Sequence, residues 1–299
     1  MSKPNARKRQ RADALRAEQA RLRAARERRQ RRLMIFGPIV VVVAIVAAMV
    51  GVKVLGGDPT PPPVSDPATQ AATIARLTSL PAATLETAGA PGKAVLTPIK
   101  GQQPLTDQGK PKVLYVGAEF CPYCASQRWP LIVALSRFGT FTGLAESHSS
   151  SSDVFPDTST LTFKDAAYTS TFLSFTPVET ADAEGNRLQS PTPADDAVFK
   201  KFNAPPYVDK DSQGSIPFID FGNRFLTSGA SVSPELFKGL DHATVVARLT
   251  DPSSDLGRQA GAAANAITAG LCSLTGDKPA EVCTGKVVAG LKGALDAGR

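Results

Sequence analysis

Cysteine, histidine and tryptophan are scarce in this chain, which has four, two and one of them among 299 residues. So few cysteines exclude the class of small secreted proteins that many disulfides hold together. Glycine and proline number 24 each and follow no period, which excludes a collagen-like repeat. Apolar residues are not scarce: they make up 42% of the chain, enough for a sizeable hydrophobic core.

A net positive charge is lacking in most of the chain and is found only at its start. Residues 1–32 contain 13 of the 34 lysines and arginines but only 3 of the 27 acidic residues. Residues 33–299 are slightly acidic, with 21 basic and 24 acidic residues. A nucleic-acid-binding domain clusters its basic residues on the folded part, so the isoelectric point near 9.3 does not indicate one. We expect this basic arm to contact anionic lipid headgroups and predict no nucleic-acid partner.

An apolar run at residues 33–54 follows the basic arm, and Lys53 is its only charged residue. About 20 apolar residues span the roughly 30 Å of bilayer hydrocarbon as a helix. Lysines and arginines beside such a helix stay in the cytoplasm. We therefore predict a single-pass anchor in the cell membrane at residues 33–55, with the basic arm cytoplasmic and the following chain extracytoplasmic. A cleavable signal peptide is the alternative, but its charged region is normally much shorter.

Residues 56–70 are rich in proline and poor in apolar residues, which is typical of an extended linker. We expect one folded domain over residues 71–299, entered through a short helical segment that reaches residue 85. Alternation and β-branched runs predict strands, and helical periodicity predicts helices. The predicted strands are 113–118, 141–146, 160–163 and 171–178, with a hairpin at 215–227, and the predicted helices are 125–138, 195–202, 241–249, 254–274 and 279–296.

A Cys-Pro-Tyr-Cys motif lies between the first of these strands and the helix after it. Cys121 is expected at the N-cap of the helix, where unpaired N–H groups and the positive end of the helix dipole stabilise a thiolate. Pro122 suits the first helical position because its missing N–H would be unpaired there anyway. Cys124, one turn further on, is shielded but close enough to form or resolve a disulfide.

The same cysteine pair has three other interpretations: half of a zinc site, a copper site, or an inert structural disulfide. Zinc takes four ligands, normally from a second close pair of cysteines, whereas Cys272 and Cys283 are well separated. Only His148 and His242 remain to complete a zinc or copper site. The sequence therefore favours redox chemistry, with no metal and no cofactor.

Cys272 and Cys283 flank a predicted turn between the last two predicted helices. We expect them to form a structural disulfide that joins a C-terminal helical hairpin. Glu119, just before the motif, is interpreted as a surface carboxylate, with proton transfer during thiol exchange as the alternative. His148 lies in a serine-rich stretch that we interpret as a mobile loop, and Trp129 is expected in the core. Pro130 is expected to kink its helix.

The order of strand, Cys-Pro-Tyr-Cys, helix and a distant Ile216-Pro217 before a hairpin resembles the thioredoxin superfamily. The dipeptide between the cysteines is that of glutaredoxins, and Ile-Pro is similar to the cis-proline loop of the superfamily. The resemblance implies an α/β, thioredoxin-like fold with extra strands and a C-terminal helical hairpin. It also implies that Pro217 and Ile216 lie beside the reactive pair and help to bind a substrate peptide. Tyr123, between the cysteines, is interpreted as a residue at the rim of the site, with contact to that peptide as the alternative.

A closer resemblance covers roughly residues 75–290. Residues 117–129, around the cysteine motif, and residues 134–139 are similar to a bacterial membrane-anchored family catalogued as domain of unknown function 929. That family implies a fold but no substrate. The chain departs from glutaredoxins in lacking recognisable glutathione contacts. The residue after Cys124 is Ala125, whereas cytosolic members of the superfamily commonly have basic residues near this position.

These observations predict a membrane-anchored, extracytoplasmic thiol–disulfide oxidoreductase. Cys121 attacks and Cys124 resolves, the substrates are exported Cys-containing proteins, and a membrane or extracytoplasmic redox partner renews the pair. The alternative is a non-catalytic thioredoxin-like module that binds a partner and keeps its cysteine pair as a structural disulfide.

The predicted topology is tested by adding a protease to intact cells whose wall it can cross. The protease is expected to remove residues 56–299 and to leave the basic arm intact, because the arginines before the anchor keep the arm inside. Antibodies against each end of the chain detect the fragments. Digestion of the arm with protection of the domain would reverse the orientation.

Overall fold

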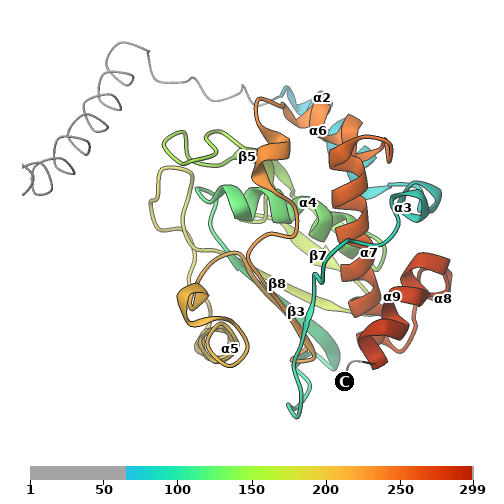
Figure 1. The fold of residues 1–299 in the computed structure, drawn as a ribbon. Helices are drawn as coiled ribbons and strands as arrows, with labels where there is room; N and C mark the ends of the chain where they lie inside the picture. The colour runs from blue at the N-terminus through green and yellow to red at the C-terminus, as the bar shows by residue number, and fades with distance from the viewer. Residues whose placement is uncertain (1–64, 298–299) are drawn as a thin grey trace, which may run out of the picture. The chain divides into compact units, whose positions relative to one another are not determined.

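The computed structural model describes residues 65–297 (Figure 1). The predicted basic arm, the predicted anchor at 33–55 and the linker up to residue 64 lie outside the described residues. Within residues 65–297 no helix is both long and apolar enough to cross a membrane. These residues form a mixed α/β structure, as predicted, in which a central sheet is covered by helices on both faces.

Six strands form the central sheet: β1 (Thr97–Pro98), β2 (Thr106–Asp107), β3 (Lys110–Gly117), β8 (Ser174–Glu179), β9 (Phe218–Phe221) and β10 (Phe225–Ser228). β3 is central and pairs in parallel with β8 along one edge and antiparallel with β9 along the other. β9 pairs with β10, and β10 with the edge strand β1, all antiparallel. The predicted hairpin is confirmed: it turns at Gly222 and Asn223, which both have positive φ, as a tight hairpin turn requires.

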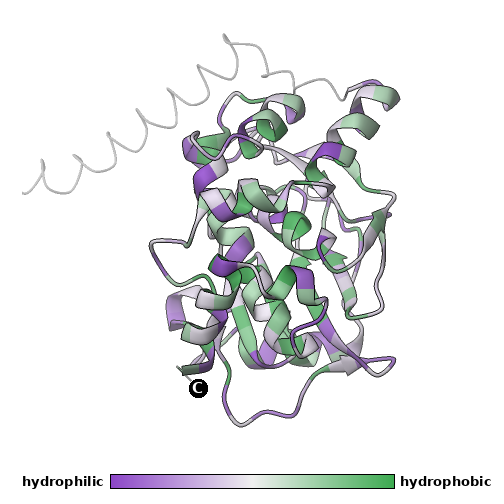
Figure 2. Cartoon of the chain, turned by 90° about the vertical axis from the view of Figure 1, so that its right-hand side faces the viewer, coloured by the Kyte–Doolittle hydropathy of each residue, from purple (hydrophilic) through white to green (hydrophobic). Residues whose placement is uncertain are grey.

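The helices and short 3-10 turns lie on both faces of this sheet. They are α2 (Pro67–Thr78), α3 (Ala82–Ala88), α4 (Pro122–Ser136), α5 (Pro193–Phe202), η1 (Lys210–Ser212), η2 (Pro234–Phe237), α6 (His242–Leu249), α7 (Asp255–Thr275), α8 (Ala280–Cys283) and α9 (Lys286–Ala297). Strand side chains alternate between the faces, so β3 contributes to two cores. Val113 and Tyr115 pack with α4 and α7, whereas Leu114 and Val116 pack with α5. In Figure 2 hydrophobic colouring is concentrated on the strands and helices.

Helix α4 is the most buried helix of the core. All its residues are buried except Tyr123 and Ser136, and Pro130 lies inside it. A helix that is buried all round lies within the core rather than on its surface. Trp129 is fully buried, as predicted, and its indole N–H donates to the Ser159 carbonyl. The helix that follows the first cysteine therefore lies at the centre of the domain.

The segment predicted as a second strand at 141–146 does not join the central sheet. It forms parts of two small separate sheets, in which β4 (Thr140–Thr142) pairs with β7 (Ala167–Thr169) and β5 (Ala145–His148) with β6 (Ser159–Thr162). Gly143, with φ of +74°, separates β4 from β5, and a Cβ there would meet the Asp165 carbonyl oxygen at 2.5 Å. Instead, β8 takes the place beside β3.

The two ends of the domain differ from the prediction in their boundaries. α2 begins inside the range assigned to the linker, because Asp66 caps it by accepting hydrogen bonds from the Ala68 and Thr69 N–H groups. The predicted helix at 279–296 is divided into α8 and α9. Glu86 explains the division: its carboxylate, from α3, accepts a hydrogen bond from the Val287 N–H at the start of α9. Cys272 and Cys283 form the predicted disulfide between α7 and α8.

Asp220 is a carboxylate inside the central sheet. It lies on β9, is fully buried, and accepts a hydrogen bond from the Asn223 N–H at 2.8 Å, while its second oxygen has no partner. Burial raises the pKa of Asp220 to about 7. At neutral pH and above, the folded protein therefore keeps an unpaired negative charge in its core.

Replacing Asp220 with Asn is expected to stabilise the protein above pH 7. The folded pKa lies above the unfolded value of 3.8, so the contribution of Asp220 to stability is present below pH 4 and lost as the pH rises to 7. The Asn variant keeps the hydrogen bond from Asn223 and carries no charge. At pH 8 we expect its free energy of unfolding to exceed that of the wild type by roughly 1 to 3 kcal/mol.

Urea unfolding from pH 4 to pH 8 measures this difference. The difference is expected to be small at pH 4, where Asp220 is neutral in the folded protein. A variant that is less stable than the wild type at pH 8 would contradict the assignment.

Candidate functional site

The two cysteines of the motif lie at the start of α4, as the sequence predicts. Cys121 is the N-cap residue, and its Sγ accepts a hydrogen bond from the Cys124 N–H at 3.2 Å. Cys121 has an exposed fraction of 6%, whereas Cys124 has none. Both are free thiols in the structure. The N-cap conformation arises locally, because Pro122 occupies the first position of the helix.

The pKa values of the two thiols are shifted in opposite directions. The hydrogen bond from the Cys124 thiol lowers the pKa of Cys121 most; burial opposes this, and the Cys124 N–H and the positive charge of Arg128 lower it further. Burial raises the pKa of Cys124 well above its usual value, and the hydrogen bond to Cys121 raises it more. Cys121 is therefore the thiol that forms a nucleophilic thiolate more easily, and Cys124 stays protonated behind it.

The Ile216–Pro217 segment lies against Cys121, although it is far away in the sequence. The Cys121 thiol donates a hydrogen bond to the Ile216 carbonyl, with 3.8 Å between sulfur and oxygen. The peptide bond between Ile216 and Pro217 is cis. Pro217 is buried and accepts a hydrogen bond from the Gly229 N–H at the end of the hairpin, while Ile216 remains partly exposed. The structure thus brings both predicted residues to the cysteine pair.

A buried ion pair lies behind the cysteines, between α4 and β8. Arg128 donates to Glu179 through Nε at 2.8 Å and through Nη2 at 2.7 Å, and neither side chain is exposed. The same Nη2 donates to the Ala118 carbonyl at 2.8 Å, in the loop that precedes Cys121. A two-point contact between arginine and a carboxylate fixes geometry as well as charge. The pair therefore positions the loop and the helix that carry the thiols.

Two polar groups near this pair have no hydrogen-bond partner. They are Nη1 of Arg128 and the hydroxyl of Tyr115, both buried. The Arg128 guanidinium lies 5.8 Å from the centre of the Tyr115 ring. The Tyr115 hydroxyl also explains why residue 117 is glycine, since a Cβ there would collide with it. One sequence signal points to Arg128: it is the basic residue of the predicted helix 125–138 that directly precedes the apolar run 129–135.

The prediction that Glu119 is a surface carboxylate is wrong. Its exposed fraction is only 9%, and it accepts a hydrogen bond from the Thr162 hydroxyl on β6. The Glu119 N–H also donates to the Ala181 carbonyl at 2.8 Å. Strand β6 contacts this carboxylate through Thr162, which the sequence alone does not reveal.

The hydrogen-bond partners of the two histidines are backbone carbonyls. Nδ1 of His148, at the end of β5, is 3.0 Å from the Ser149 carbonyl and 3.8 Å from Asp157. His242 is buried, and its Nε2 is 2.8 Å from the carbonyls of Ser147 and Thr160. In the part of the chain that the structure describes, no group of three His, Cys, Asp or Glu side chains is arranged to hold a metal ion.

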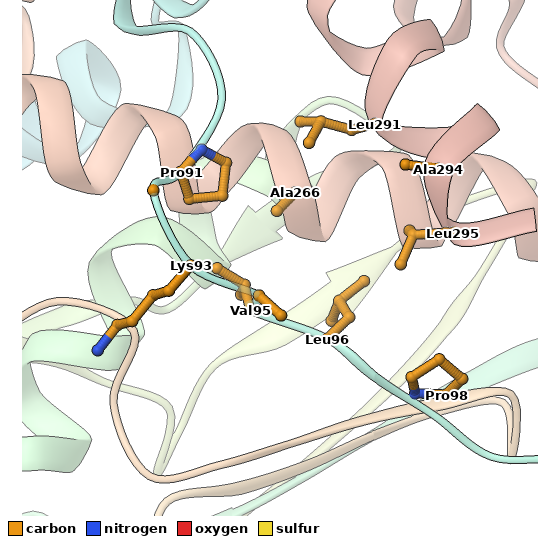
Figure 3. A pocket seen from close by; sticks show the side chains of 11 residues that line it. Pro91, Lys93, Val95, Leu96, Pro98, Ala266, Leu291, Ala294 and Leu295 are labelled. Atoms are coloured by element: carbon orange, nitrogen blue, oxygen red, sulfur yellow. The ribbon is translucent and has the colours of Figure 1, made fainter. Parts of the chain in front are cut away.

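An apolar pocket of about 440 Å³ lies at a different place, between the segment 91–98 and helices α7 and α9 (Figure 3). Val95, Leu96, Leu291 and Leu295 line it. It contains none of the cysteines and no converging polar groups, which a site for chemistry on a small ligand needs. We therefore assign the candidate site to the cysteine pair.

The fold and site together define an α/β domain with a Cys-Pro-Tyr-Cys motif at a helix N-terminus beside a cis-proline. The model of the family described as Domain of unknown function (DUF929) matches residues 99–273, so this chain belongs to that family. The match includes Cys121, Cys124 and Pro217. No curated protein matches the chain, and no solved structure matches it.

We expect different free energies of unfolding when one partner of the ion pair is replaced and when both are replaced. Arg128→Met leaves Glu179 buried without a partner and is expected to lower the free energy of unfolding by about 3 to 5 kcal/mol. Arg128→Met combined with Glu179→Leu leaves no buried charge and is expected to recover most of that loss. Urea unfolding measures both values.

The double variant also tests the electrostatic effect on the thiol. Because it lacks the positive charge of Arg128, we expect the pKa of Cys121 to rise, and the pH profile of alkylation by iodoacetamide to shift upward. An unchanged profile in a folded double variant would show that Arg128 has no influence on Cys121.

Proposed function

We propose that this protein is a thiol–disulfide oxidoreductase with a thioredoxin-like fold, which acts on exported Cys-containing proteins. One observation carries the proposal: an N-cap cysteine with a lowered pKa lies in hydrogen-bond contact with a buried cysteine whose pKa is raised. That arrangement supplies an attacking thiolate and a protected resolving thiol in one motif.

The thioredoxin-like fold is supported by three features taken together. The buried strand β3 leads into the cysteine motif and α4. The cis Ile216–Pro217 bond precedes the β9–β10 hairpin. The carbonyl between these two residues contacts Cys121, so the proline loop lies beside the reactive pair, which is the position that the resemblance implies. The small sheets β4–β7 and β5–β6 and the helices α7 to α9 are then additions to that fold.

The proposed reaction proceeds in two exchanges. The Cys121 thiolate attacks one sulfur of a substrate disulfide; a new S–S bond forms, the substrate bond breaks, and the released substrate thiolate takes up a proton. Cys124 then loses its proton and attacks Sγ of Cys121. The mixed disulfide breaks, the second substrate thiol leaves, and Cys121 and Cys124 are joined. The substrate gains the two electrons that the protein loses, and the reverse sequence oxidises a substrate dithiol.

Arg128 supports the second exchange. Cys124 is fully buried, so forming its thiolate is unfavourable, and the nearby positive charge of Arg128 opposes that penalty. The ion pair with Glu179 holds the guanidinium in place, and Nη1 remains without a partner. We assign Arg128 the role of a positioning residue that stabilises developing charge on the sulfur.

An extracytoplasmic location follows from the predicted anchor and has independent support in the described domain. Cys272 and Cys283 are joined by a disulfide. Such bonds persist in oxidising compartments and are rare in the cytosol. We propose that residues 33–55 hold the domain at the outer side of the cell membrane, where a membrane or extracytoplasmic partner renews the cysteine pair.

Replacing Cys124 with Ala tests the mechanism and finds the substrates. The variant cannot resolve the mixed disulfide that Cys121 forms, so substrates are expected to remain covalently attached. Non-reducing gels and mass spectrometry of the membrane fraction measure these adducts, which are expected to disappear on reduction.

The control is the double variant in which both cysteines are replaced by Ala, and it is expected to give no adducts. Equal adducts in the two variants would show that the attachment does not involve Cys121. An absence of adducts in both variants, with a wild-type pair that is redox-inert, would instead favour the non-catalytic partner-binding module.

A further inference from the structure

Two large apolar side chains are exposed in the described part of the chain: one lies between the cysteines, and the other belongs to a loop that contacts the motif. Tyr123, between the cysteines, has an exposed fraction of 43%, and Val154 one of 76%. Val154 belongs to the loop between β5 and β6, which packs on the motif: the Tyr123 ring meets the Phe155 ring edge-on, with 6.0 Å between centroids. An exposed apolar patch of this kind commonly marks an interaction surface.

The loop that carries Val154 is held in place by hydrogen bonds, contrary to the prediction of a mobile serine-rich loop. The Ser150 N–H donates to the Phe120 carbonyl, directly before Cys121. The hydroxyl of Ser149 donates to the Phe155 carbonyl and accepts from the Thr158 N–H. These bonds fix the loop against the motif, so Val154 is presented to solvent by a built structure.

The reactive sulfur is nearly covered by the groups around it. Cys121 is only 6% exposed, so a substrate sulfur must approach closely between the groups that surround it. Those groups are the partly exposed Ile216, which contacts the thiol through its carbonyl, and Tyr123, two residues along the chain. The residues that flank a substrate cysteine therefore come to lie against Tyr123 and its neighbours.

The charge around the site disfavours a small acidic thiol as the substrate. Segments 118–127 and 146–163 contain no lysine or arginine, and Arg128 is buried and paired with Glu179. The loop itself carries Asp153 and Asp157. The carboxylates of a compound such as glutathione have no exposed cation to pair with in these two segments. An uncharged apolar segment meets no electrostatic repulsion there.

We propose that Tyr123, Val154 and Phe155 form a docking patch for apolar, extended segments that flank the cysteines of unfolded exported proteins. This inference rests on the proposed redox function and specifies the substrate class for the same site. The patch buries apolar side chains of the substrate next to Cys121 and so selects proteins before they fold.

The test uses the pre-reduced full-length protein in detergent and two synthetic disulfide-linked peptide dimers. In one peptide leucine and phenylalanine flank the cysteine, and in the other glycine and serine flank it. The second-order rate constant for reduction of each dimer is measured, with bis(2-hydroxyethyl) disulfide as a small neutral reference. The wild type is expected to reduce the apolar dimer about tenfold faster than the polar dimer, since burying one aliphatic side chain corresponds to about that factor.

Val154→Asp is expected to lower this apolar-to-polar ratio by about fivefold or more, because it places a charge on the patch. Val154 is highly exposed, so the substitution leaves folding intact. Ser151→Asp is the matched control: it adds the same charge to an exposed position of the same loop, keeps Val154, and is expected to retain the ratio.

The outcomes separate this inference from the proposed function. A wild-type protein that reduces bis(2-hydroxyethyl) disulfide but shows no preference between the dimers overturns the docking patch alone. An equal fall of the ratio in both Asp variants overturns it too, since charge and not the valine would then be responsible. A protein that reduces none of the three disulfides contradicts the oxidoreductase function itself.

Discussion

The ion pair between Arg128 and Glu179 is the interaction on which the rest of the site depends. It joins α4, which carries the cysteines, to β8, and a third hydrogen bond joins it to Ala118 before Cys121. Neither charge is exposed, so each would cost several kcal/mol without its partner. Arrangements of α4, β8 and the Ala118 loop that separate the two charges are therefore strongly disfavoured. The observed arrangement places a positive charge where it lowers the pKa of Cys121.

The additions to the central sheet give the site its particular surroundings. The small β5–β6 sheet contacts Glu119 through Thr162, and the loop between its strands packs against Tyr123. Further along the chain, the cis Ile216–Pro217 segment supplies a carbonyl to the thiol. The core of the domain holds the reactive pair, and the inserted elements determine which surfaces a substrate meets. The chain thus combines a thiol–disulfide exchange site with surroundings that are specific to this protein.

The sequence by itself determined the features that depend on neighbouring residues. The N-cap position of Cys121 follows from the strand before it and Pro122 after it, and the β9–β10 turn follows from Gly222 and Asn223. Helices α6 and α7 also lie where their periodicity and capping residues predict, within one residue. Dihedral preferences, capping and hydrophobic period act over a few residues, so the local sequence contains them in full. The pairing of Cys272 with Cys283 belongs to this group, since only a short turn separates their helices.

Only the tertiary structure decided which distant groups meet. β8 pairs with β3, whereas the nearer segment around β4 and β5 is divided at Gly143 and pairs with β7 and β6. Glu86 divides the last helix from some 200 residues away, and Glu179 gives Arg128 its partner. The burial of these charges and the contact of Phe155 with Tyr123 have no counterpart in local composition. The physical reason is that the free energy of a buried charge or an apolar contact depends on its partner, and packing of the whole chain chooses that partner.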